Sequence, residues 1–432
     1  MEEKNVRIES YFEKYQDVPR EVILKESLLR EGFWITKAAR DASKDKLNKS
    51  FILFSYIKSG WDELKDDAAS LPEEIKIMGG QYNLRRTIVR TTLSKESQYV
   101  VDMLDGELTL TEYGKSIAKV SYTARPKYYD LSFEDGTPYS HIIPLRGGGR
   151  IAFINAYRVC QYWGPNEECK FCDINNNLRK LKQYDPAKAT DAILNVEKMA
   201  TVAKAMYDDL LPGYDDLKLN MFFITGGTIT KTVKGMDEDE YYLRYVTAVR
   251  ERTGFRTPLV IMTSAKTKEQ IKRYKDAGIS AHHANMEVWD KDLFKIVCPG
   301  KEGFVGRDEW VKRVIDSVEI LGEGNAAPKF VAGTEMAQPW GFKDYRDAVK
   351  SLTEGLDYYM KHGVTAGLLN WCVEEGSDLK GHPNPPLDFF IQMDINWYEL
   401  FKKYDLVPIL GWGSLGPGRA TNNNSAYMDM GT

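Results

Sequence analysis

The sequence has neither a long apolar run nor a strong excess of one charge. No stretch approaches the roughly 18 consecutive apolar residues of a membrane-spanning helix. The first residues, MEEKNVRIESYFEKYQ, are charged and lack the apolar core of a signal peptide. The 59 basic and 63 acidic residues leave a net charge of −4, which gives no electrostatic reason to bind nucleic acid or an anionic membrane. We therefore expect a cytoplasmic protein with neither partner.

Cysteine is also scarce, and the five cysteines do not form the pattern of a disulfide framework, because their number is odd and the chain has 432 residues. A chain of this length with 43% hydrophobic residues can bury a large core without covalent crosslinks. Three of the cysteines, Cys160, Cys169 and Cys172, nevertheless lie close together. A metal site is the first hypothesis that this clustering raises.

Residues 1–147 differ in pattern from the rest of the chain. Residues 20–69 are predicted to be mainly helical, whereas residues 85–143 contain the β-rich runs RTIVRTTL, SIAKVSYTA, YYDLSF and SHIIPL. Asp135-Gly136 lies between two such runs and predicts a tight hairpin. Gly147-Gly148-Gly149 marks a boundary. We predict an α+β domain over 1–147 that acts as a cap or in substrate recognition.

Strands and helices alternate over residues 148–403. Six strand–helix units predict an α/β fold with a parallel sheet and outer helices, a partial (β/α)6 TIM-like barrel, since a closed barrel has eight units. The site is expected where the strands end. Residues 404–432 are rich in Gly and Asn with aromatics interspersed, and they are predicted to be a tail or a lid. The predicted strands are 151–156, 219–225, 258–264, 279–288, 328–335 and 364–373. The predicted helices are 186–206, 237–253, 266–278, 307–321, 343–362 and 386–403.

Cys160, Cys169 and Cys172 directly follow the first strand of this region, with eight and then two residues between them. The C-x-x-C pair places two thiolates on one tight turn, and the third arrives from a longer loop. Three thiolates can hold three irons of a [4Fe–4S] cubane and leave the fourth iron open to another ligand. Two other interpretations stay open. A structural zinc site wants four ligands, and no fourth Cys or His lies nearby in sequence. Three unligated core cysteines are the other interpretation.

This motif, at the end of the first strand of a six-unit barrel, resembles the radical S-adenosylmethionine (SAM) superfamily. Within the superfamily, the segment from Cys298-Pro299-Gly300-Lys301 through Gly306-Arg307-Asp308 resembles the biotin-synthase-like branch. The commonest spacing there has three residues between the first two cysteines, whereas this chain has eight. The resemblance implies two cofactors, a [4Fe–4S] cluster and SAM, with the amino and carboxylate groups of SAM on the open iron. It also implies a one-electron reductant such as flavodoxin or ferredoxin.

The second strand ends in Gly226 and Gly227, and glycine lets a ligand approach the backbone closely. The superfamily has a Gly-Gly-Glu motif at this position, and its backbone receives the SAM amino group. Thr228 replaces the glutamate here, which keeps the backbone contacts and removes the carboxylate. Close packing of helix on sheet is the alternative reason for the glycines.

Asn285 and Glu287 share one face of the fourth strand, and an acid inside a barrel needs a partner. The resemblance places Glu287 at the SAM ribose or amine. It makes Arg307 or Arg313 a candidate for the SAM carboxylate, because arginine offers a bidentate fork. Solvated helix surface is the alternative for either arginine. The remaining SAM contacts implied by the resemblance are at Phe171, Val331 and Leu369. Thr263 and Ser264 end the third strand and are candidates for the SAM ribose, with a polar strand end that caps the next helix as the alternative.

No acid–base pair stands out on the substrate side. His282 and His283 are consecutive in a strand, so one points inward and the other outward. The inward one is a candidate base or polar anchor, with a satisfied core histidine as the alternative. Cys372, at the end of the sixth strand, is a candidate radical relay or auxiliary ligand, with a buried small hydrophobe as the alternative. Cys298 is expected to be inert.

The resemblance implies reductive cleavage of SAM to a 5′-deoxyadenosyl radical. That radical would take hydrogen from a small biosynthetic substrate in a rearrangement, a dehydrogenation or a carbon–carbon bond change. With three clustered cysteines, a second cysteine-ligated cluster is not expected. Two alternatives stay open. One is a radical SAM enzyme that modifies a peptide or protein and uses residues 1–147 for recognition, and the other is a metal-binding module without catalysis.

Overall fold

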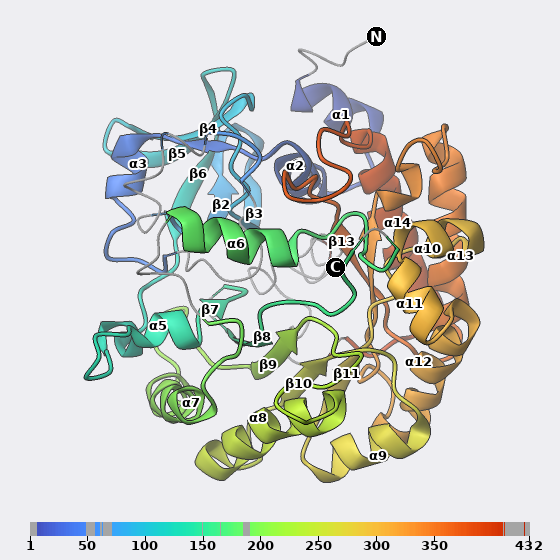
Figure 1. Cartoon of the computed structure of the whole chain (residues 1–432). Coiled ribbons are helices and arrows are strands. Elements are labelled where there is room, and N and C mark those ends of the chain that lie inside the picture. Colours follow the sequence, from blue (N-terminus) through green and yellow to red (C-terminus); the bar gives the residue numbers. More distant parts are fainter. Residues whose placement is uncertain are drawn as a thin grey trace.

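The computed structural model describes residues 7–48, 57–60, 63, 71–148, 150–164, 166–184, 191–408, 410 and 427 of the 432-residue chain. In Figure 1 the amino-terminal strands, coloured blue to cyan, lie above a group of green and yellow strands. Helices surround this second group from below and from the right. Strands from both groups line one cavity.

The amino-terminal sheet has six strands in the order β1-β4-β5-β6-β2-β3, and every pairing except that of β1 with β4 is antiparallel. Helix α2 (Arg20–Glu31) packs against β3, and its apolar residues join the buried core of this sheet. Two shorter helices are α1 (Ile8–Lys14) and α3 (Lys37–Asp41). The strands are Trp34–Ile35, Glu74–Gly79, Leu84–Arg90, Tyr99–Leu104, Glu107–Glu112 and Lys115–Tyr122 for β1 to β6.

Two predicted strands of this region are wrong. The run YYDLSF contains the 3-10 helix η3 (Lys127–Asp130), and SHIIPL begins with helix α5 (Tyr139–Ile142). Pro126 and Pro138 stand directly before these helices, where their fixed φ suits a helix start. The turn at Asp135-Gly136 is confirmed, with Gly136 at φ 81°. The predicted helical region 20–69 contains α2 and α3, while 49–56, 61–62 and 64–70 lie outside the described residues.

The second part contains six parallel strands, which confirms the predicted α/β class. Four of them form a five-stranded sheet with the short antiparallel β7 (Leu145–Arg146), in the order β11-β10-β9-β8-β7. Strands β12 and β13 pair separately, and single bridges from His282 to Ala326 and from Glu287 to Phe330 join β11 to β12. The strands are Ile151–Tyr157, Met221–Gly226, Leu259–Met262, Ala281–His283, Lys329–Ala332 and Gly367–Asn370 for β8 to β13.

Helices follow these strands and cover their outer side. Capping boxes at Asp237 and Thr267 fix the first turns of α8 and α9. The predicted helix 186–206 begins too early, because α7 starts at Val196 with Asn195 as its cap; residues 185–190 are outside the described part. Helix α6 was not predicted. The helices are Ile174–Tyr184, Val196–Leu210, Glu238–Thr253, Lys268–Asp276, Lys291–Val297, Pro299–Phe304, Arg307–Leu321, Tyr345–Met360 and Leu387–Lys403 for α6 to α14, with the 3-10 turn η4 at Thr334–Met336.

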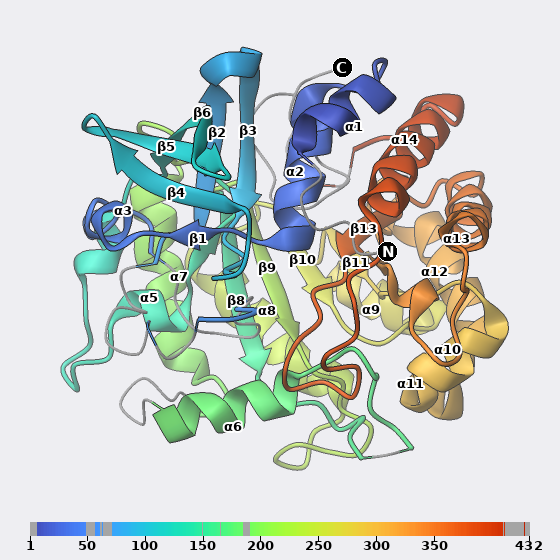
Figure 2. The same ribbon diagram turned by 90° about the horizontal axis from the view of Figure 1, so that it is seen from above.

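The amino-terminal part packs against the last helix of the chain. Helix α2 lies beside α14 in both ribbon views (Figures 1 and 2). Leu387 and Ile391 of α14 belong to the same buried cluster as Ile23 and Leu24 of α2. The residues numbered up to 147 therefore cover the side of the parallel strands next to β13.

A pair of buried carboxyls lies in this interface. Burial raises the pKa of Asp394 well above its usual range, and the Glu26 carboxyl beside it raises the pKa further. Burial also raises the pKa of Glu26 to about 7, although hydrogen bonds from Asn370 and Asp394 oppose the shift. In the unfolded chain both groups ionise near pH 4. The free energy of unfolding therefore falls as the pH rises from about 4 through these raised native values.

Replacing Asp394 by asparagine is expected to raise the free energy of unfolding, with a larger gain at pH 8 than at pH 5, because the buried carboxyl must stay protonated at the higher pH. The amide keeps the shape of the group and needs no proton to remain buried. Urea denaturation of both proteins at the two pH values measures the difference. An equal gain at pH 5 and pH 8 would show that ionisation of Asp394 does not limit stability.

Within the described ranges, no helix is both long and apolar enough to cross a membrane. Most of the predicted tail or lid lies outside those ranges, at residues 409, 411–426 and 428–432. Leu410 packs against a buried cluster on the parallel strands that includes Ile151 and Met221. Tyr427 stacks on Tyr398 of α14 at 4.3 Å between ring centroids. These two contacts fix the tail at two places.

Candidate functional site

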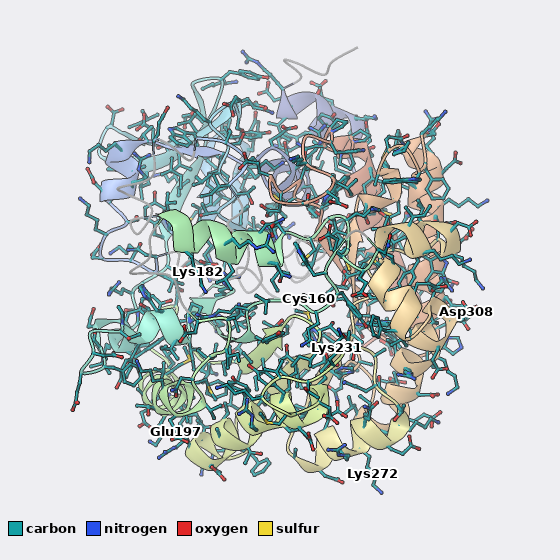
Figure 3. All side chains as sticks on the ribbon, viewed as in Figure 1. Cys160, Lys182, Glu197, Lys231, Lys272 and Asp308 are labelled. Carbon is teal, nitrogen blue, oxygen red and sulfur yellow. The ribbon has the colours of Figure 1, made fainter. Side chains whose placement is uncertain are left out.

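A cavity of about 290 Å³ extends from the cysteine loop along the inner faces of the parallel strands to the amino-terminal sheet. All three clustered cysteines line it. In Figure 3, Cys160 lies near the centre of the molecule, whereas Glu197, Lys272 and Asp308 lie at its periphery. The cysteine motif follows the end of β8, and its partly exposed thiols line this cavity.

The cysteine loop is fixed by hydrogen bonds to its neighbours. The N–H of Cys160 donates to Oδ1 of Asn175 at 2.7 Å, and Nδ2 of Asn175 donates back to the carbonyl of Cys160 at 3.1 Å. The N–H of Cys172 donates to the carbonyl of Cys169 at 2.9 Å, which closes the expected tight turn. Gln161 N–H donates to the carbonyl of Thr228 at 2.9 Å. The loop is therefore tied to both α6 and the end of β9.

The electrostatic environment differs among the three thiols. Burial raises the pKa of Cys160 to about 12 and that of Cys172 well above its usual value, and the nearby Cys169 adds to both shifts. A hydrogen bond from Cys298 lowers the pKa of Cys169, and the positive charge of Lys301 lowers it further. Cys169 is therefore the thiol best prepared to ionise.

Cys298 was expected to be inert, and the structure places it in contact with Cys169. Its segment is held against the cysteine loop because the N–H of Gly300 donates to the carbonyl of Glu167 at 3.0 Å. A Cβ on Gly300 would overlap this carbonyl and lie 2.7 Å from a ring carbon of Tyr162. Gly300 is the feature of the sequence that could have indicated this close contact between the Cys298 segment and the cysteine loop.

The donor set fits an iron–sulfur cubane better than a single ion. Among the described residues, no three His, Cys, Asp or Glu side chains converge closely enough to hold one metal ion. A cubane binds each thiolate through a different iron, so its ligands need not converge. The three thiols face one cavity, and burial keeps Cys160 and Cys172 protonated. Iron can replace these protons, because a metal stabilises the thiolate form.

Most of the residues that the sequence analysis predicts to contact SAM line the same cavity. Glu287 has a left-handed backbone with φ 67°, a strained conformation for a side chain of this kind. Its Oε1 lies 2.6 Å from Nζ of Lys301, which also donates to the carbonyl of Asn285 at 2.7 Å. The lining residues from that prediction are Phe171, Gly226, Gly227, Thr228, Thr263, Glu287, Val331 and Leu369.

Three residues of the SAM prediction do not line this cavity. Arg307 donates to the carbonyl of Trp289 at 2.7 and 3.0 Å, and Arg313 binds Glu309 at 2.8 Å. The hydroxyl of Ser264 donates to Glu238. The cation that lies beside Glu287 in the cavity is Lys301. The sequence analysis did not select Lys301 as a binding residue, although it directly follows Cys298-Pro299-Gly300.

The glycine pair is required by backbone packing. A Cβ on Gly226 would lie 2.5 Å from the carbonyl oxygen of Tyr157. A Cβ on Gly227 would overlap the carbonyl oxygen of Val159 and lie 2.5 Å from Cα of Cys160. The glycines thus let the end of β9 contact the start of the cysteine loop directly, and they also line the cavity.

A buried ion cluster supports this loop from behind. Nζ of Lys266 lies 2.6 Å from both Glu238 Oε2 and Asp239 Oδ1, and all three side chains are at most 6% exposed. Oε1 of Glu238 accepts the N–H of Ile229 at 3.1 Å, just after the glycine pair. Burial alone would raise the pKa of Asp239, but Lys266 and neighbouring hydrogen bonds hold the pKa below its usual value.

Replacing Lys266 by methionine is expected to lower the free energy of unfolding by about 3 to 5 kcal/mol, because two buried carboxylates lose their cation. The matched control is Lys268→Met, whose ion pair with Glu319 is exposed to solvent and should contribute little to stability. Chemical denaturation of the two variants measures both values. Equal losses would show that the buried cluster contributes no more than a surface pair.

The two histidines point in opposite directions, as predicted. Nε2 of His282 lies 2.9 Å from the hydroxyl of Thr263, and its ring meets Tyr274 of the outer helix α9. His283 faces the cavity. Cys372 is buried but does not line the cavity, and burial raises its pKa to about 12. His283 is therefore the one of the three catalytic candidates that faces the cavity.

Further charged residues line the other end of the cavity and were not predicted. The Arg146 guanidinium lies 3.0 Å from Oε1 of Glu73 and over the ring of Phe153 at 4.6 Å. Burial raises the pKa of Glu74 to about 7, and the Glu73 carboxylate adds to the shift. The full set of unpredicted charged lining residues is Glu73, Glu74, Arg90, Arg146, Lys301 and Lys329.

Sequence comparison finds one relevant curated relative. No protein-family model matches the chain. Bacteriochlorophyllide c C-7(1)-hydroxylase of Chlorobaculum limnaeum is 25% identical over 137 residues, which are 32% of this chain and 31% of that protein. The chain thus spans about a third of the length of this relative.

Several solved structures match part of this chain. Methylornithine synthase matches at a TM-score of 0.40 and 15% identity, over 66% of this chain and 76% of that chain. Coproporphyrinogen III oxidase of Escherichia coli, described as a radical SAM enzyme, matches at 0.35 and 11%, over 64% and 57%. SuiB of Streptococcus suis matches at 0.39 and 13%, over 62% and 49%. At these TM-scores the likenesses support no residue role.

Proposed function

We propose that this chain is a radical SAM enzyme that acts on a small biosynthetic substrate. One observation carries the proposal. Three thiols of one loop, at the carboxyl end of β8, face the same cavity as the glycine pair of β9 and the Glu287–Lys301 ion pair. Thiolates suit an iron–sulfur cluster. A glycine-lined strand end beside a buried acid–base pair suits the zwitterionic end of an amino acid such as the methionyl part of SAM.

The proposed architecture follows the predicted division of the chain. Residues 148–403 act as a partial (β/α)6 barrel whose two sheets are joined through β11 and β12. Residues 1–147 close its side and supply part of the substrate end of the cavity through Glu73, Glu74, Arg90 and Arg146. Residues 404–432 form the proposed lid or tail. The biotin-synthase-like branch remains a resemblance based on the segment 298–308.

Different residues along the cavity would bind the cluster and SAM. Cys160, Cys169 and Cys172 would hold the cluster, and Lys301 with Glu287 would bind the charged end of SAM. When bound, the cluster and SAM supply a 5′-deoxyadenosyl radical that removes hydrogen from an unactivated carbon. The buried walls exclude water and fix the substrate's orientation. An external reductant such as flavodoxin or ferredoxin would supply the electron.

The two alternative functions, a peptide- or protein-modifying enzyme and a metal-binding module without catalysis, would require different structural features. A peptide or protein substrate needs an open groove or an accessible sheet edge, whereas the charged substrate end here lies among buried side chains. A metal-binding module without catalysis has no use for a cavity that continues from the cysteines to the amino-terminal sheet. The small-molecule reaction accounts for both features.

Anaerobic reconstitution with iron and sulfide tests the proposal. We expect a cluster signal in electron paramagnetic resonance after reduction and a change in that signal when SAM is added. We also expect formation of 5′-deoxyadenosine and methionine. Protein that takes up zinc in place of iron, or that binds a cluster without responding to SAM, would overturn the proposal.

A further inference from the structure

The parallel strands contribute a histidine and a lysine from neighbouring strands to the cavity wall. His283 ends β11 and Lys329 begins β12, and both line the cavity. Their side chains are almost fully buried, with His283 1% and Lys329 4% exposed. They are close enough that the charge of Lys329 lowers the pKa of His283, after burial itself.

His283 has unused hydrogen-bonding capacity. Neither of its ring nitrogens has a hydrogen-bond partner among the described residues, although the ring is buried. A buried polar group without a partner costs about 1 to 3 kcal/mol, so such a group facing a cavity indicates a ligand. Burial keeps the ring neutral by lowering its pKa well below the usual value. A neutral imidazole offers one N–H donor.

The fold makes room for the lysine. Lys329 pairs in register with Gly367 of β13. A Cβ on Gly367 would overlap the ammonium group and lie 2.8 Å from Cδ of Lys329. The backbone is fixed as well, since the carbonyl of Lys329 accepts the N–H groups of Met286 and Glu287 at 3.0 Å each. The ammonium thus lies beside Gly367 of β13, while the Lys329 backbone is bound to the segment that carries Glu287.

The charges around the cavity favour an anion. Four cationic side chains and three carboxylates line it, and Arg146 and Lys301 each pair with one of those carboxylates. The remaining acid, Glu74, is partly neutral because burial raises its pKa to about 7, and Lys329 is partly neutral because burial lowers its pKa to about 7. An anion bound beside Lys329 would favour its charged form. A three-thiolate cluster and SAM carry opposite net charges that largely cancel. A net positive charge is therefore left for the substrate to balance.

The rest of this wall is apolar. The rings of Phe153 and Phe223 stack at 5.6 Å between centroids, and the edge of His283 meets Phe223 at 5.4 Å. Ile151 and Met262 extend this surface. A ligand that reaches the two polar groups must lie along an aromatic and aliphatic floor.

We propose that His283 and Lys329 bind the carboxylate of the substrate, and that the substrate is a carboxylic acid with an apolar body lying on Phe153 and Phe223. This rests on the function proposed above. Lys329 would donate a charge-assisted hydrogen bond to one carboxylate oxygen, and the His283 N–H would donate to the other. Both residues are binding residues, with no proton transfer assigned to them.

Benzoate and its neutral isostere benzamide are the probes. Ligand-observed NMR would give their dissociation constants with the reconstituted wild-type protein and with Lys329→Met, His283→Phe and Arg146→Met, the last of which removes a rival cation that lies over the ring of Phe153. We expect wild type to prefer benzoate. Lys329→Met should weaken benzoate binding about tenfold or more, as for one charge-assisted hydrogen bond, and His283→Phe roughly fivefold. Benzamide binding should change little.

Equal binding of benzoate and benzamide would overturn the proposal. A loss of benzoate binding that follows Arg146→Met and spares Lys329→Met would overturn it too. If Lys329→Met does not fold, His283→Phe tests the carboxylate site by itself, because phenylalanine keeps an aromatic ring of similar shape at this position.

Iron content and SAM cleavage are measured on the same samples. A wild type that prefers benzoate but takes up no iron contradicts the radical SAM function alone. A wild type that cleaves SAM without this preference contradicts the carboxylate site alone.

Discussion

Replacing Cys172 by alanine is expected to reduce 5′-deoxyadenosine formation from SAM to an undetectable level. Three thiolates leave one iron of a cubane open, and two thiolates no longer hold the cluster in place. Cys172 closes the tight turn with Cys169 and faces the cavity, whereas Cys298, which also contacts Cys169, does not line it. Iron content per chain and product formation measure the result under anaerobic conditions.

Cys372→Ala is the matched control for this variant. Both thiols are buried deeply enough that burial raises their pKa, but Cys372 does not line the cavity. Each substitution should cost a similar, small amount of stability, about 1 kcal/mol. The control should keep its iron and its activity. Loss of iron in both variants would mean that the effect comes from weakened folding, and would remove Cys172 from the proposed ligand set.

The sequence predicted the parts of the site that depend on local order along the chain. The cysteine spacing, the glycines after the second strand and the opposite directions of His282 and His283 are short-range features. They needed only correct placement of the strands, which hydrophobic runs and capping residues indicate well. The α/β class was predicted for the same reason, because alternation of strand and helix is visible in a single sequence.

Contacts between segments that are far apart in the chain could not be predicted from the sequence. Lys301 and Arg307 belong to one stretch of sequence, and the sequence gives no measure of which cation turns inward. Arginine was preferred for its bidentate geometry, whereas the shorter helix α11 directs Lys301 at Glu287. Cys298 meets Cys169 because Gly300 permits a close approach to the carbonyl of Glu167.

The charged residues at the substrate end of the cavity could not be predicted either, because they come from distant segments of the chain. Arg90 and Arg146 reach it from the amino-terminal part, and Lys329 reaches it from β12. Each of these residues looks like an ordinary charged residue in its own segment. The prolines before η3 and α5 also misled the strand prediction near β7, since local β propensity there is overridden by a fixed φ.

Replacing Gly227 by alanine is expected to abolish cluster binding without removing any ligand. The new methyl group would overlap the carbonyl oxygen of Val159 and lie 2.5 Å from Cα of Cys160. Both neighbours are backbone atoms, so they cannot move aside as a flexible side chain does. Overpacking of this kind costs about 1 to 3 kcal/mol when the backbone shifts. That shift would displace Cys160 from the other two thiols, and iron content should fall with it.

The matched control is Gly303→Ala in α11, where the added Cβ meets nothing within 4 Å. Alanine in a helix is favoured over glycine by about 1 kcal/mol, so this control should be as stable as wild type or slightly more stable. It should bind iron normally, because Gly303 lies in the helix of Lys301 and leaves the packing of the cysteine loop unchanged. If Gly227→Ala bound iron and cleaved SAM like wild type, the cluster would not depend on the contact between β9 and the cysteine loop. Loss of iron in Gly227→Ala with the cysteines intact would instead show that the glycine serves to position Cys160.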